Sequence, residues 1–406
     1  MAMALALVLP LVLQRASTIC MERNFFKLAL AMSQKRIAVV CTARPSYAKL
    51  QPVIAALIAC NTRPMLYFTS GAVLTRFGRV VDQARTDFPD CSLREIYSEL
   101  DGQTLVTSAK SAGGLLMALA DAFAQDRPDI VLVNHDRREV LAVAQAAAYQ
   151  NIPVAHIGGG ERSGNIDDRV RDAVTQFSTY HFVATSAATL RVCGLRMGHD
   201  DRHAHIYCVG CPSVDMARQS LDDPPVTLTE MGGAGAALDL NCPFLLVVQH
   251  SETEHPDAAF GQMMTTLNAV RVTKYPAVVL WPGTDAGEEE TAKAIRVSAA
   301  ENPSYPMHTK RTLPPRRFLR LLRQAVCVVG NSSVGIREAS FLGVPVVNIG
   351  ERQRDRERGD NVLDVPHHFD AIKHAIITQT THGPWPSTVL YGDGYASQEI
   401  ARILTS

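Results

Sequence analysis

The stretch DIVLVNHDRREVLAVAQAAAYQNIPVAHIGGG, residues 129–160, decides the fold class. Its apolar runs Asp129–Val133 and Pro153–Ile157 predict two strands, and the alanine-rich segment Val140–Tyr149 between them predicts a helix. Strands that are apolar almost throughout are typical of parallel sheets, in which helices cover both faces. The stretch therefore predicts a strand–helix–strand unit whose two strands are parallel neighbours.

The same alternation continues in both directions along the chain. Further strands of the first series are predicted at Arg36–Val40, Met65–Thr69, His181–Ala184 and Ile206–Val209, and further helices at Leu50–Cys60 and Arg169–Phe177. Residues 220–240 are rich in Pro, Gly and Asp, which predicts a linker. A second series then follows, with strands predicted at Phe244–Val248, Ala277–Trp281, Val326–Val329 and Pro345–Ile349. We therefore expect an α/β protein with two Rossmann-like, doubly wound parallel sheets.

A chain of 406 residues is too long for one ordinary core and suits two domains. The expected domains are residues 35–218 and 241–390. A C-terminal helix in residues 391–406 is expected to pack back on the first domain. Ligands of doubly wound sheets bind beyond the C-terminal ends of the strands, so we expect a shared cleft between the domains.

Composition excludes several classes of function. Acidic and basic residues balance at 40 each and aromatic residues make up 6%, so no basic, aromatic surface for nucleic acid is expected. The nine cysteines include one CxxC, Cys208 to Cys211, without a second pair at zinc spacing. We expect thiols in a reducing compartment, no metal and no cofactor.

Residues 1–34 form a leader of uncertain status. Met1–Leu13 is apolar but too short to span a bilayer, and no positive charge precedes it as in a secretory signal. The sequence favours a disordered or mis-assigned leader, while a targeting or membrane-tethering role stays open. The first convincing strand begins only near Lys35.

The clearest local pattern in the second half is Gly330–Glu338, which follows a predicted strand and opens a predicted helix. Amide groups at a helix start, together with Ser332 and Ser333, are typical of a phosphate site. The alternative is a serine N-cap with small residues for close packing. Downstream, the arginine-rich loop Gly350–Arg358 fits either a solvated loop or a mobile arm that closes on an anion.

Polar residues also follow the other predicted strands. Arg44 comes after the first strand, without the glycine pattern of a nicotinamide site. Asp136 follows the third strand, and Glu161 and Asp167 belong to the glycine-containing segment after the next one. His250 follows the first strand of the second half. All of them are expected in or near the cleft.

Taken together, these segments resemble the UDP-N-acetylglucosamine 2-epimerase family, which has the GT-B fold, and most of all its hydrolysing branch. The resemblance runs from about Lys35 to the end of the chain. The matching segments are Asn151–Ile157, Ile166–Asp168, Asp285–Gly287, Asn331–Ser333 with Gly335, Val346–Gly350 and Tyr391–Gly394.

The resemblance implies roles for individual residues. It implies a UDP site made of Arg44, Asn331, Ser332, Ser333, Gly335, Glu338 and Arg352. Within that set, Arg44 would contact the diphosphate, the two serines the phosphate and Glu338 the ribose. It implies a catalytic set made of Asp136, Asp167, His250 and Glu161.

The chain also departs from the family pattern, mainly at the sugar end of the cleft. Gly158 stands where the family has a glutamate that is considered catalytic, and Glu161 is the candidate to substitute for it. Asn134–Asp136 replaces the usual His-Gly-Asp. Ser46 replaces an acidic residue, and Ser251 replaces a proline.

The resemblance implies loss of UDP from UDP-N-acetylglucosamine, or a close relative, through a glycal intermediate. Hydration of the glycal would then release N-acetylmannosamine, the precursor of sialic acid. The alternatives are a hydrolase without inversion, an epimerase of a modified sugar, a GT-B glycosyltransferase, and a binding protein without turnover. The two acids Asp136 and Asp167 favour epimerisation over glycosyl transfer. We expect a cytoplasmic homo-oligomer, a dimer or tetramer, that binds a UDP-sugar but no nucleic acid or membrane.

Overall fold

The computed structural model describes residues 35–101, 104–164, 166–197, 205–252, 254–283 and 286–406. The predicted leader, residues 1–34, and Asp285 of the family resemblance lie outside the described residues.

The first half is built on a seven-stranded parallel sheet in the order β3-β2-β1-β4-β5-β6-β7. Its strands are β1 (Ile37–Cys41), β2 (Met65–Thr69), β3 (Leu93–Ile96), β4 (Ile130–Asn134), β5 (Val154–Ile157), β6 (Tyr180–Val183) and β7 (His205–Cys208). The chain adds strands on one side of β1 and then returns to add β4 on the other side. The crevice of this doubly wound sheet therefore lies at the ends of β1 and β4.

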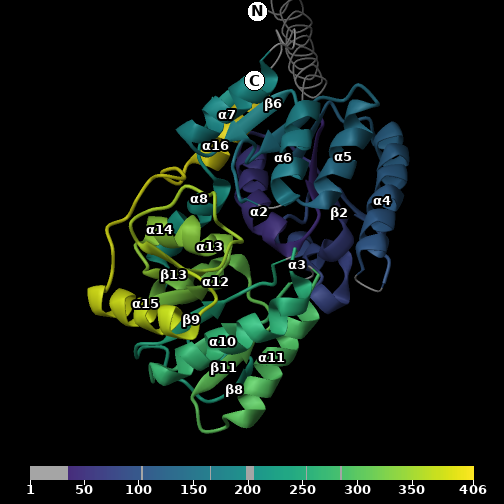
Figure 1. Ribbon diagram of the computed structural model, residues 1–406. Helices are drawn as coiled ribbons and strands as arrows, with labels where there is room; N and C mark the ends of the chain where they lie inside the picture. The colour runs from purple at the N-terminus through teal and green to yellow at the C-terminus, as the bar shows by residue number, and fades with distance from the viewer. Residues whose placement is uncertain (1–34, 102–103, 165, 198–204, 253, 284–285) are drawn as a thin grey trace, which may run out of the picture.

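Helices cover both faces of this sheet (Figure 1). They are α2 (Arg44–Ala59), α3 (Val80–Asp87), α4 (Leu105–Asp126), α5 (Arg138–Ala148), α6 (Ile166–Phe177) and α7 (Ser186–Arg196). Successive residues of a strand point to opposite faces. Accordingly Val39 packs in a core with α2, whereas Ala38 and Val40 pack in a second core with α4 and α5.

The second half repeats this design with the order β14-β13-β12-β9-β10-β11-β8. Its parallel strands are β9 (Leu245–Val248), β10 (Ala277–Leu280), β11 (Met307–Lys310), β12 (Cys327–Gly330), β13 (Val346–Ile349) and β14 (Val362–Val365), and the two-residue β8 (Ala234–Gly235) pairs antiparallel with β11. Its helices are α9 (Leu228–Met231), α10 (Ala259–Val272), α11 (Glu288–Glu301), α12 (Pro315–Gln324), α13 (Ser333–Ile336), α14 (Glu338–Leu342) and α15 (Phe369–His382). Here the crevice lies at the ends of β9 and β12.

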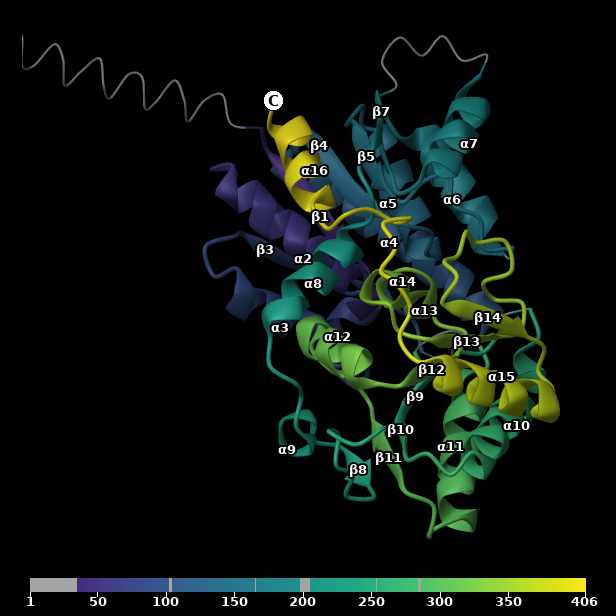
Figure 2. The same ribbon diagram turned by 90° about the vertical axis from the view of Figure 1, so that its left-hand side faces the viewer.

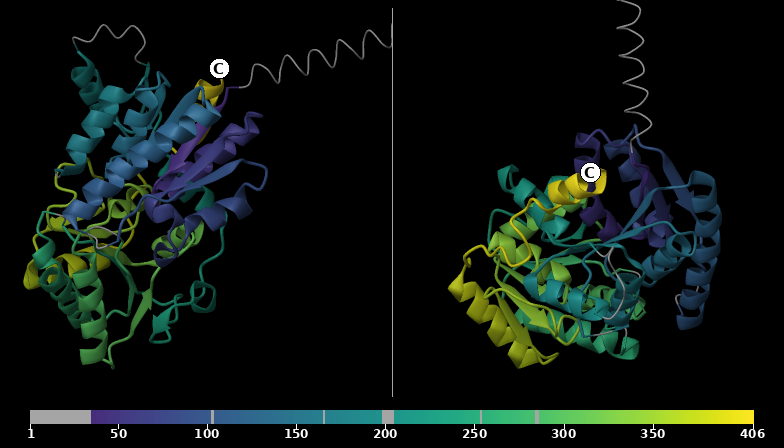
Figure 3. Two further views of the ribbon diagram at one scale, coloured as in Figure 1. Left: turned by 90° about the vertical axis from the view of Figure 1, so that its right-hand side faces the viewer. Right: turned by 90° about the horizontal axis from the view of Figure 1, so that it is seen from above.

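Two helices connect the halves. α8 (Pro212–Gln219) packs against α2 and against α12 and α14. α16 (Ala396–Thr405) returns to the first half, where Ile400 and Leu404 join the core of β1 and α2 (Figures 2 and 3). The buried carboxylate of Asp215 on α8 accepts hydrogen bonds from the amides of Ala396 (3.1 Å) and Ser397 (2.6 Å), which fixes the start of α16.

The expected fold class is confirmed: the protein is α/β with two Rossmann-like sheets, as in the GT-B fold. Two local predictions were wrong. The helix expected at Leu50–Cys60 begins earlier, at Arg44, because Pro45 stands in its first turn, where the missing amide costs nothing. The predicted linker 220–240 carries α9 and the edge strand β8. In the described part of the chain, no helix has the length and apolar character needed to cross a membrane.

Candidate active site

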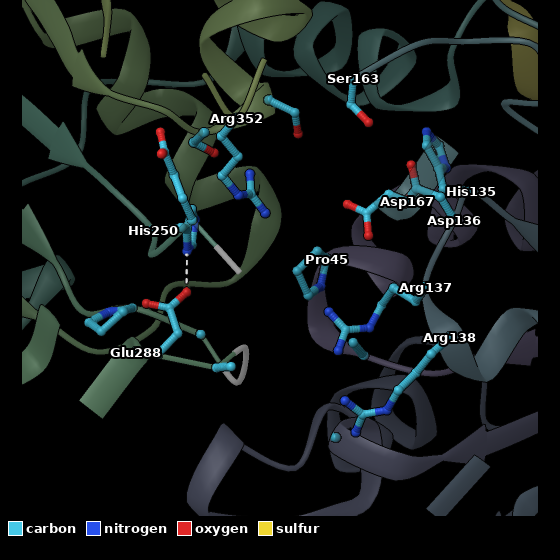
Figure 4. Close-up of a pocket in the computed structure, with 18 of the residues that line it drawn as sticks. Pro45, His135, Asp136, Arg137, Arg138, Ser163, Asp167, His250, Glu288 and Arg352 are labelled. Atoms are coloured by element: carbon cyan, nitrogen blue, oxygen red, sulfur yellow. Dashed lines mark hydrogen bonds and ion pairs between the residues drawn. The ribbon is translucent and has the colours of Figure 1, made fainter. Parts of the chain in front are cut away.

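A cleft of about 770 Å³ lies between the two sheets, at the strand ends where both crevices are expected. This volume suits a small-molecule ligand. Figure 4 shows its two walls: Asp136, Asp167 and His135 on the side of the first half, and His250, Glu288 and Arg352 on the side of the second. Among the residues with expected roles, those that line it are Arg44, Asp136, Asp167, His250, Ser332, Ser333 and Arg352.

Asp136 follows β4 and is held by arginines. Its carboxylate accepts a hydrogen bond from Arg171, whose side chain is fully buried on α6, and lies 3.8 Å from the guanidinium of Arg356. Burial by itself raises the pKa of Asp136, but Arg171 and Arg356 outweigh burial and hold that pKa well below its usual range. Asp136 is therefore a fixed negative charge in the wall of the cleft.

Glu161 is buried behind the wall and does not line the cleft. Its Oε2 accepts hydrogen bonds from Arg337 and Arg356, both of which come from the second half of the chain. Burial by itself raises the pKa of Glu161, but the charges of Arg337 and Arg356 outweigh burial and lower that pKa to about 2. The structure therefore does not bring Glu161 to a place where it could cover for Gly158, and instead makes it a contact between the halves.

Asp167 lies in the first turn of α6 and points into the cleft (Figure 4). Its neighbour Asp168 has a different task. The carboxylate of Asp168 accepts hydrogen bonds from the amides of Ser163 (2.7 Å) and Gly164 (3.0 Å) and from Arg171 (2.6 Å). Asp168 thereby fixes the loop before α6, whereas Asp167 lines the cleft.

His250 follows β9 and is oriented from two directions. Asn331 clamps its backbone: the side-chain amide donates to the His250 carbonyl (2.9 Å), and the His250 amide donates to Asn331 Oδ1 (2.8 Å). The imidazole Nδ1 lies 3.0 Å from Oε1 of Glu288, a buried carboxylate at the start of α11 (Figure 4). A carboxylate on one ring nitrogen fixes the orientation of the ring and the position of its proton.

Asn331 follows Gly330, which has a backbone φ of 141° and lies directly against β9. A Cβ added at Gly330 would come within 2.2 Å of the Val248 carbonyl oxygen. Only glycine can stand so close to the backbone of β9. This close contact brings the loop after β12 near enough for Asn331 to reach His250. The side chain of Asn331 is thus occupied by this clamp and does not line the cleft.

Ser332, Ser333 and Arg352 line the cleft from the second half of the chain. Ser332 caps the four-residue helix α13, its hydroxyl accepting from the Val334 amide at 3.4 Å. Arg352 donates to the Asn331 carbonyl at 3.3 Å. From the first half, Arg44 at the start of α2 donates to the Arg311 carbonyl at 3.5 Å, which is a contact between the two halves.

Two residues with expected UDP-binding roles lie elsewhere. A Cβ at Gly335 would approach the Val346 side chain to 2.9 Å, so Gly335 allows close packing of α13 on β13. Glu338 begins α14 outside the cleft lining, and its buried Oε2 has no hydrogen-bond partner within the described chain. The structure does not place Glu338 where it would meet a ribose in this cleft.

The arginine-rich loop 350–358 joins the halves. Arg356 is buried against Glu161, and Arg354 donates to the Gly164 carbonyl at 3.3 Å. The interpretation as a solvated loop is therefore wrong at Arg356, because an ion pair with a buried carboxylate compensates the loss of its water.

Sequence reasoning also missed Lys49, which lines the cleft from α2. Since the helix was expected to start at Leu50, no face could be assigned to Lys49. Burial and the nearby Arg337 lower the pKa of Lys49 to about 8. Glu288 and Arg171 were missed because only the fold brings them to His250 and Asp136. Among the described residues, no three His, Cys, Asp or Glu side chains are grouped to hold a metal ion.

Comparison with known proteins agrees with this architecture. The Neisseria meningitidis UDP-GlcNAc 2-epimerase bound to UDP-GlcNAc superposes with a TM-score of 0.74 at 20% identity, over 91% of this chain and 99% of that one. The Methanocaldococcus jannaschii UDP-GlcNAc 2-epimerase, crystallised with UDP-GlcNAc and UDP, gives a TM-score of 0.73 at 19% identity over the same shares.

Sequence comparison goes further than fold. The hydrolysing UDP-N,N'-diacetylbacillosamine 2-epimerase of Legionella pneumophila is 31% identical over 373 residues, which cover 91% of this chain and 95% of that protein. The UDP-N-acetylglucosamine 2-epimerase of Neisseria meningitidis is 26% identical over 348 residues, 84% of this chain and 87% of that protein. The sequence profile of UDP-N-acetylglucosamine 2-epimerases matches residues 66–405. The chain therefore belongs to the UDP-N-acetylglucosamine 2-epimerase family.

Proposed function

We propose that this enzyme hydrolyses a UDP-activated 2-acetamido sugar and inverts the configuration at C2. The observation that carries the proposal is the lining of the cleft. Arg44, Lys49 and Arg352 line it, and its facing walls present Asp167 and His250. The first group suits a diphosphate and the second suits proton transfer on a sugar.

The proposed reaction separates charge in a way that this cleft can stabilise. Breaking the bond between C1 and the UDP oxygen places negative charge on the diphosphate, and fixed cations near that oxygen lower the barrier. Epimerisation further requires that a proton leave C2 and that another arrive on the opposite face, which calls for groups on two sides of the ring. Asp167 and the His250–Glu288 pair come from opposite walls.

For the sugar, we propose a 2,4-diacetamido hexose first and N-acetylglucosamine second. The Legionella pneumophila relative is a hydrolysing epimerase of UDP-N,N'-diacetylbacillosamine, and this chain spans 95% of it. The departures from the family pattern, Gly158 and His135 above all, lie at the sugar end. We further propose that the first half holds the sugar and the second half holds UDP.

The proposal can be tested by incubating the purified protein with each UDP-sugar in D2O and following the products by proton NMR. Release of UDP together with a manno-configured sugar deuterated at C2 is the expected result. The Asp167→Asn variant is the matched control, since it should keep UDP binding and lose deuterium incorporation.

Other products would identify the alternatives. UDP with an undeuterated, gluco-configured sugar would indicate a simple hydrolase. Release of UDP only when an acceptor sugar is added would indicate a glycosyltransferase. Tight UDP binding without turnover of either substrate would refute an enzymatic role toward both sugars.

A further inference from the structure

The outward face of α4 carries large apolar side chains in contact with solvent. Val106 is 64% exposed and Met117 is 73% exposed. Figure 1 shows α4 beside α5 on the outside of the first half. Single apolar residues scattered over a surface are ordinary, but a group of them on one face is typical of a contact with another molecule.

The exposed residues of α4 form one stripe along the helix. Positions 106, 110, 113, 117, 121 and 124 recur every three or four residues, and all six are exposed. The stripe consists of Val106, Lys110, Gly113, Met117, Asp121 and Ala124. The buried residues Leu115 and Leu119 lie on the opposite side of α4. The stripe therefore points directly away from the core of the first half.

The neighbouring helix α5 widens this face without adding charge. After Glu139, α5 contains only Val, Leu, Ala and Gln, and Tyr149 at its end is 73% exposed. The side-chain amide of Gln150 donates to the Ala120 carbonyl (3.1 Å), so the end of α5 lies beside the middle of α4, where Met117 stands. Tyrosine and methionine are enriched in the cores of protein interfaces, and charged residues are depleted there.

The two charges of the stripe are placed for a second, antiparallel copy of the same helix. Lys110 and Asp121 are separated by about three turns, or about 17 Å along the axis. A two-fold axis through the point midway between them places Lys110 of each copy opposite Asp121 of the other, which makes two ion pairs. Within the described part of its own chain, neither side chain has an ion-pair partner.

The same axis brings Met117 of one copy against Gly114 of the other. A Cβ added at Gly113 or Gly114 would meet no atom within 4 Å, so the space beside these two glycines is open. The flexible side chain of methionine is suited to filling such a space. Glycine inside a helix weakens that helix, and the close approach of a second backbone is a physical reason for two of them here.

We propose that the faces of α4 and α5 join two copies of this chain in an antiparallel, two-fold dimer. The stripe is complementary to itself in charge, and the whole chain has no net charge, so two copies do not repel each other. A membrane surface fits less well, because helices that bind it are rich in lysine and arginine and the stripe carries a single lysine. The proposal goes beyond the proposed function and does not rest on it.

The dimer face is built on helices that also border the cleft. Leu105 and Ser108 at the start of α4 line the cleft, as does Arg138 at the start of α5. The guanidinium of Arg138 donates to Ser108 Oγ (3.1 Å), which links the two helix starts. A partner bound across both helices therefore holds this edge of the cleft in place.

Sedimentation equilibrium of the full-length protein tests the proposal. We expect the wild-type protein to sediment at micromolar concentration as a dimer with twice the mass of one chain. Met117→Glu places a charge at the centre of the face and should raise the dissociation constant of the dimer at least about 100-fold. Because Met117 is exposed in the single chain, the fold should persist, which circular dichroism and the melting temperature check.

Charge reversal tests the register of the two helices. In Lys110→Glu the new carboxylate faces Asp121 of the partner, and in Asp121→Lys the new ammonium faces Lys110. Each single variant should raise the dissociation constant of the dimer at least about 10-fold at low salt. The double variant restores both ion pairs with reversed sign and should return the dissociation constant to within about threefold of wild type. A merely destabilised monomer would not recover in this way.

Ile377→Glu is the matched control, because Ile377 is an exposed apolar residue on α15 in the second half. It should leave the dissociation constant of the dimer unchanged. A wild-type protein that is monomeric at about 100 μM overturns the proposal. An oligomer that Met117→Glu leaves intact overturns the assignment of this face. If the single charge reversals weaken the dimer and the double variant does not recover, the antiparallel register is wrong.

Discussion

Replacing Glu161 by glutamine should destabilise the protein by about 3 kcal/mol at neutral pH. The change removes one negative charge while keeping the shape of the side chain, and leaves Arg337 and Arg356 facing each other around a neutral amide. The pKa of Glu161 falls from 4.5 to about 2 in the folded protein. A difference of roughly 2.5 pKa units corresponds to about 3 kcal/mol. Loss of one partner from a buried ion pair costs about 3–5 kcal/mol in other proteins, which agrees.

The same shift fixes how the effect depends on pH. Because the folded-state pKa lies below the unfolded value, the stabilisation is fully present above about pH 4.5 and is lost as pH falls toward 2. The glutamine variant has no carboxylate to protonate. The stabilities of the wild-type protein and the variant should therefore differ at pH 7 and converge only as pH falls to about 2.

The measurement is urea unfolding followed by circular dichroism over this pH range. Asp82→Asn is the control, because Asp82 is 56% exposed and pairs with Arg79 and Arg85 at the surface. Exposed pairs contribute about 0–1 kcal/mol. A loss in Glu161→Gln no larger than in this control, or a difference between wild type and variant that is undiminished at about pH 2, would refute the account of Glu161 as a buried link between the halves.

Three further predictions concern the cleft. Lys49 has a pKa of about 8 and is charged below that pH, so the UDP affinity of the wild-type protein should fall as pH rises through 8. The Lys49→Arg variant should keep its UDP affinity over the same range. If calorimetry shows the same dependence of UDP affinity on pH for both proteins, the prediction is wrong. Arg44→Ala should weaken UDP binding by about 10- to 100-fold, as expected for a lost charged hydrogen bond, and unchanged affinity would remove Arg44 from the diphosphate site. Asp167→Asn should lower kcat by about 100- to 10,000-fold with UDP affinity nearly unchanged, and a kcat within threefold of wild type would exclude it as a proton carrier.

The fold was accessible from sequence because its strands are apolar almost throughout. Ile130–Asn134 and Val154–Ile157 are buried along their whole length, and such runs stand out against the helices between them. The start of α2 was predicted wrongly because the preference of proline for the first turn of a helix was overlooked at Pro45. The antiparallel edge strand β8 has two exposed residues, Ala234 and Gly235, and therefore no hydrophobic pattern to recognise.

The site was only partly accessible from sequence. Residues that directly follow a strand, such as Asp136, His250 and Ser332, were expected in the cleft and line it. Their partners could not be found in this way. Arg171 reaches Asp136 from a position 35 residues away, and Arg356 reaches Glu161 from 195 residues away. An arginine on a helix or in a loop carries no sequence signal that separates a buried partner from a solvated surface charge.

Those partners decide what the cleft can do. Three buried arginines, Arg171, Arg337 and Arg356, are matched by three carboxylates, those of Asp136, Glu161 and Asp168. Because the charges of this cluster balance, it provides little net attraction for an anion, and its role is to fix the wall and join the halves. We therefore expect the attraction for a diphosphate to come from other cations that line the cleft, Arg44, Lys49 and Arg352 among them. Substitutions in the cluster should consequently change stability and geometry first, whereas substitutions in the second group should change UDP affinity and its dependence on salt.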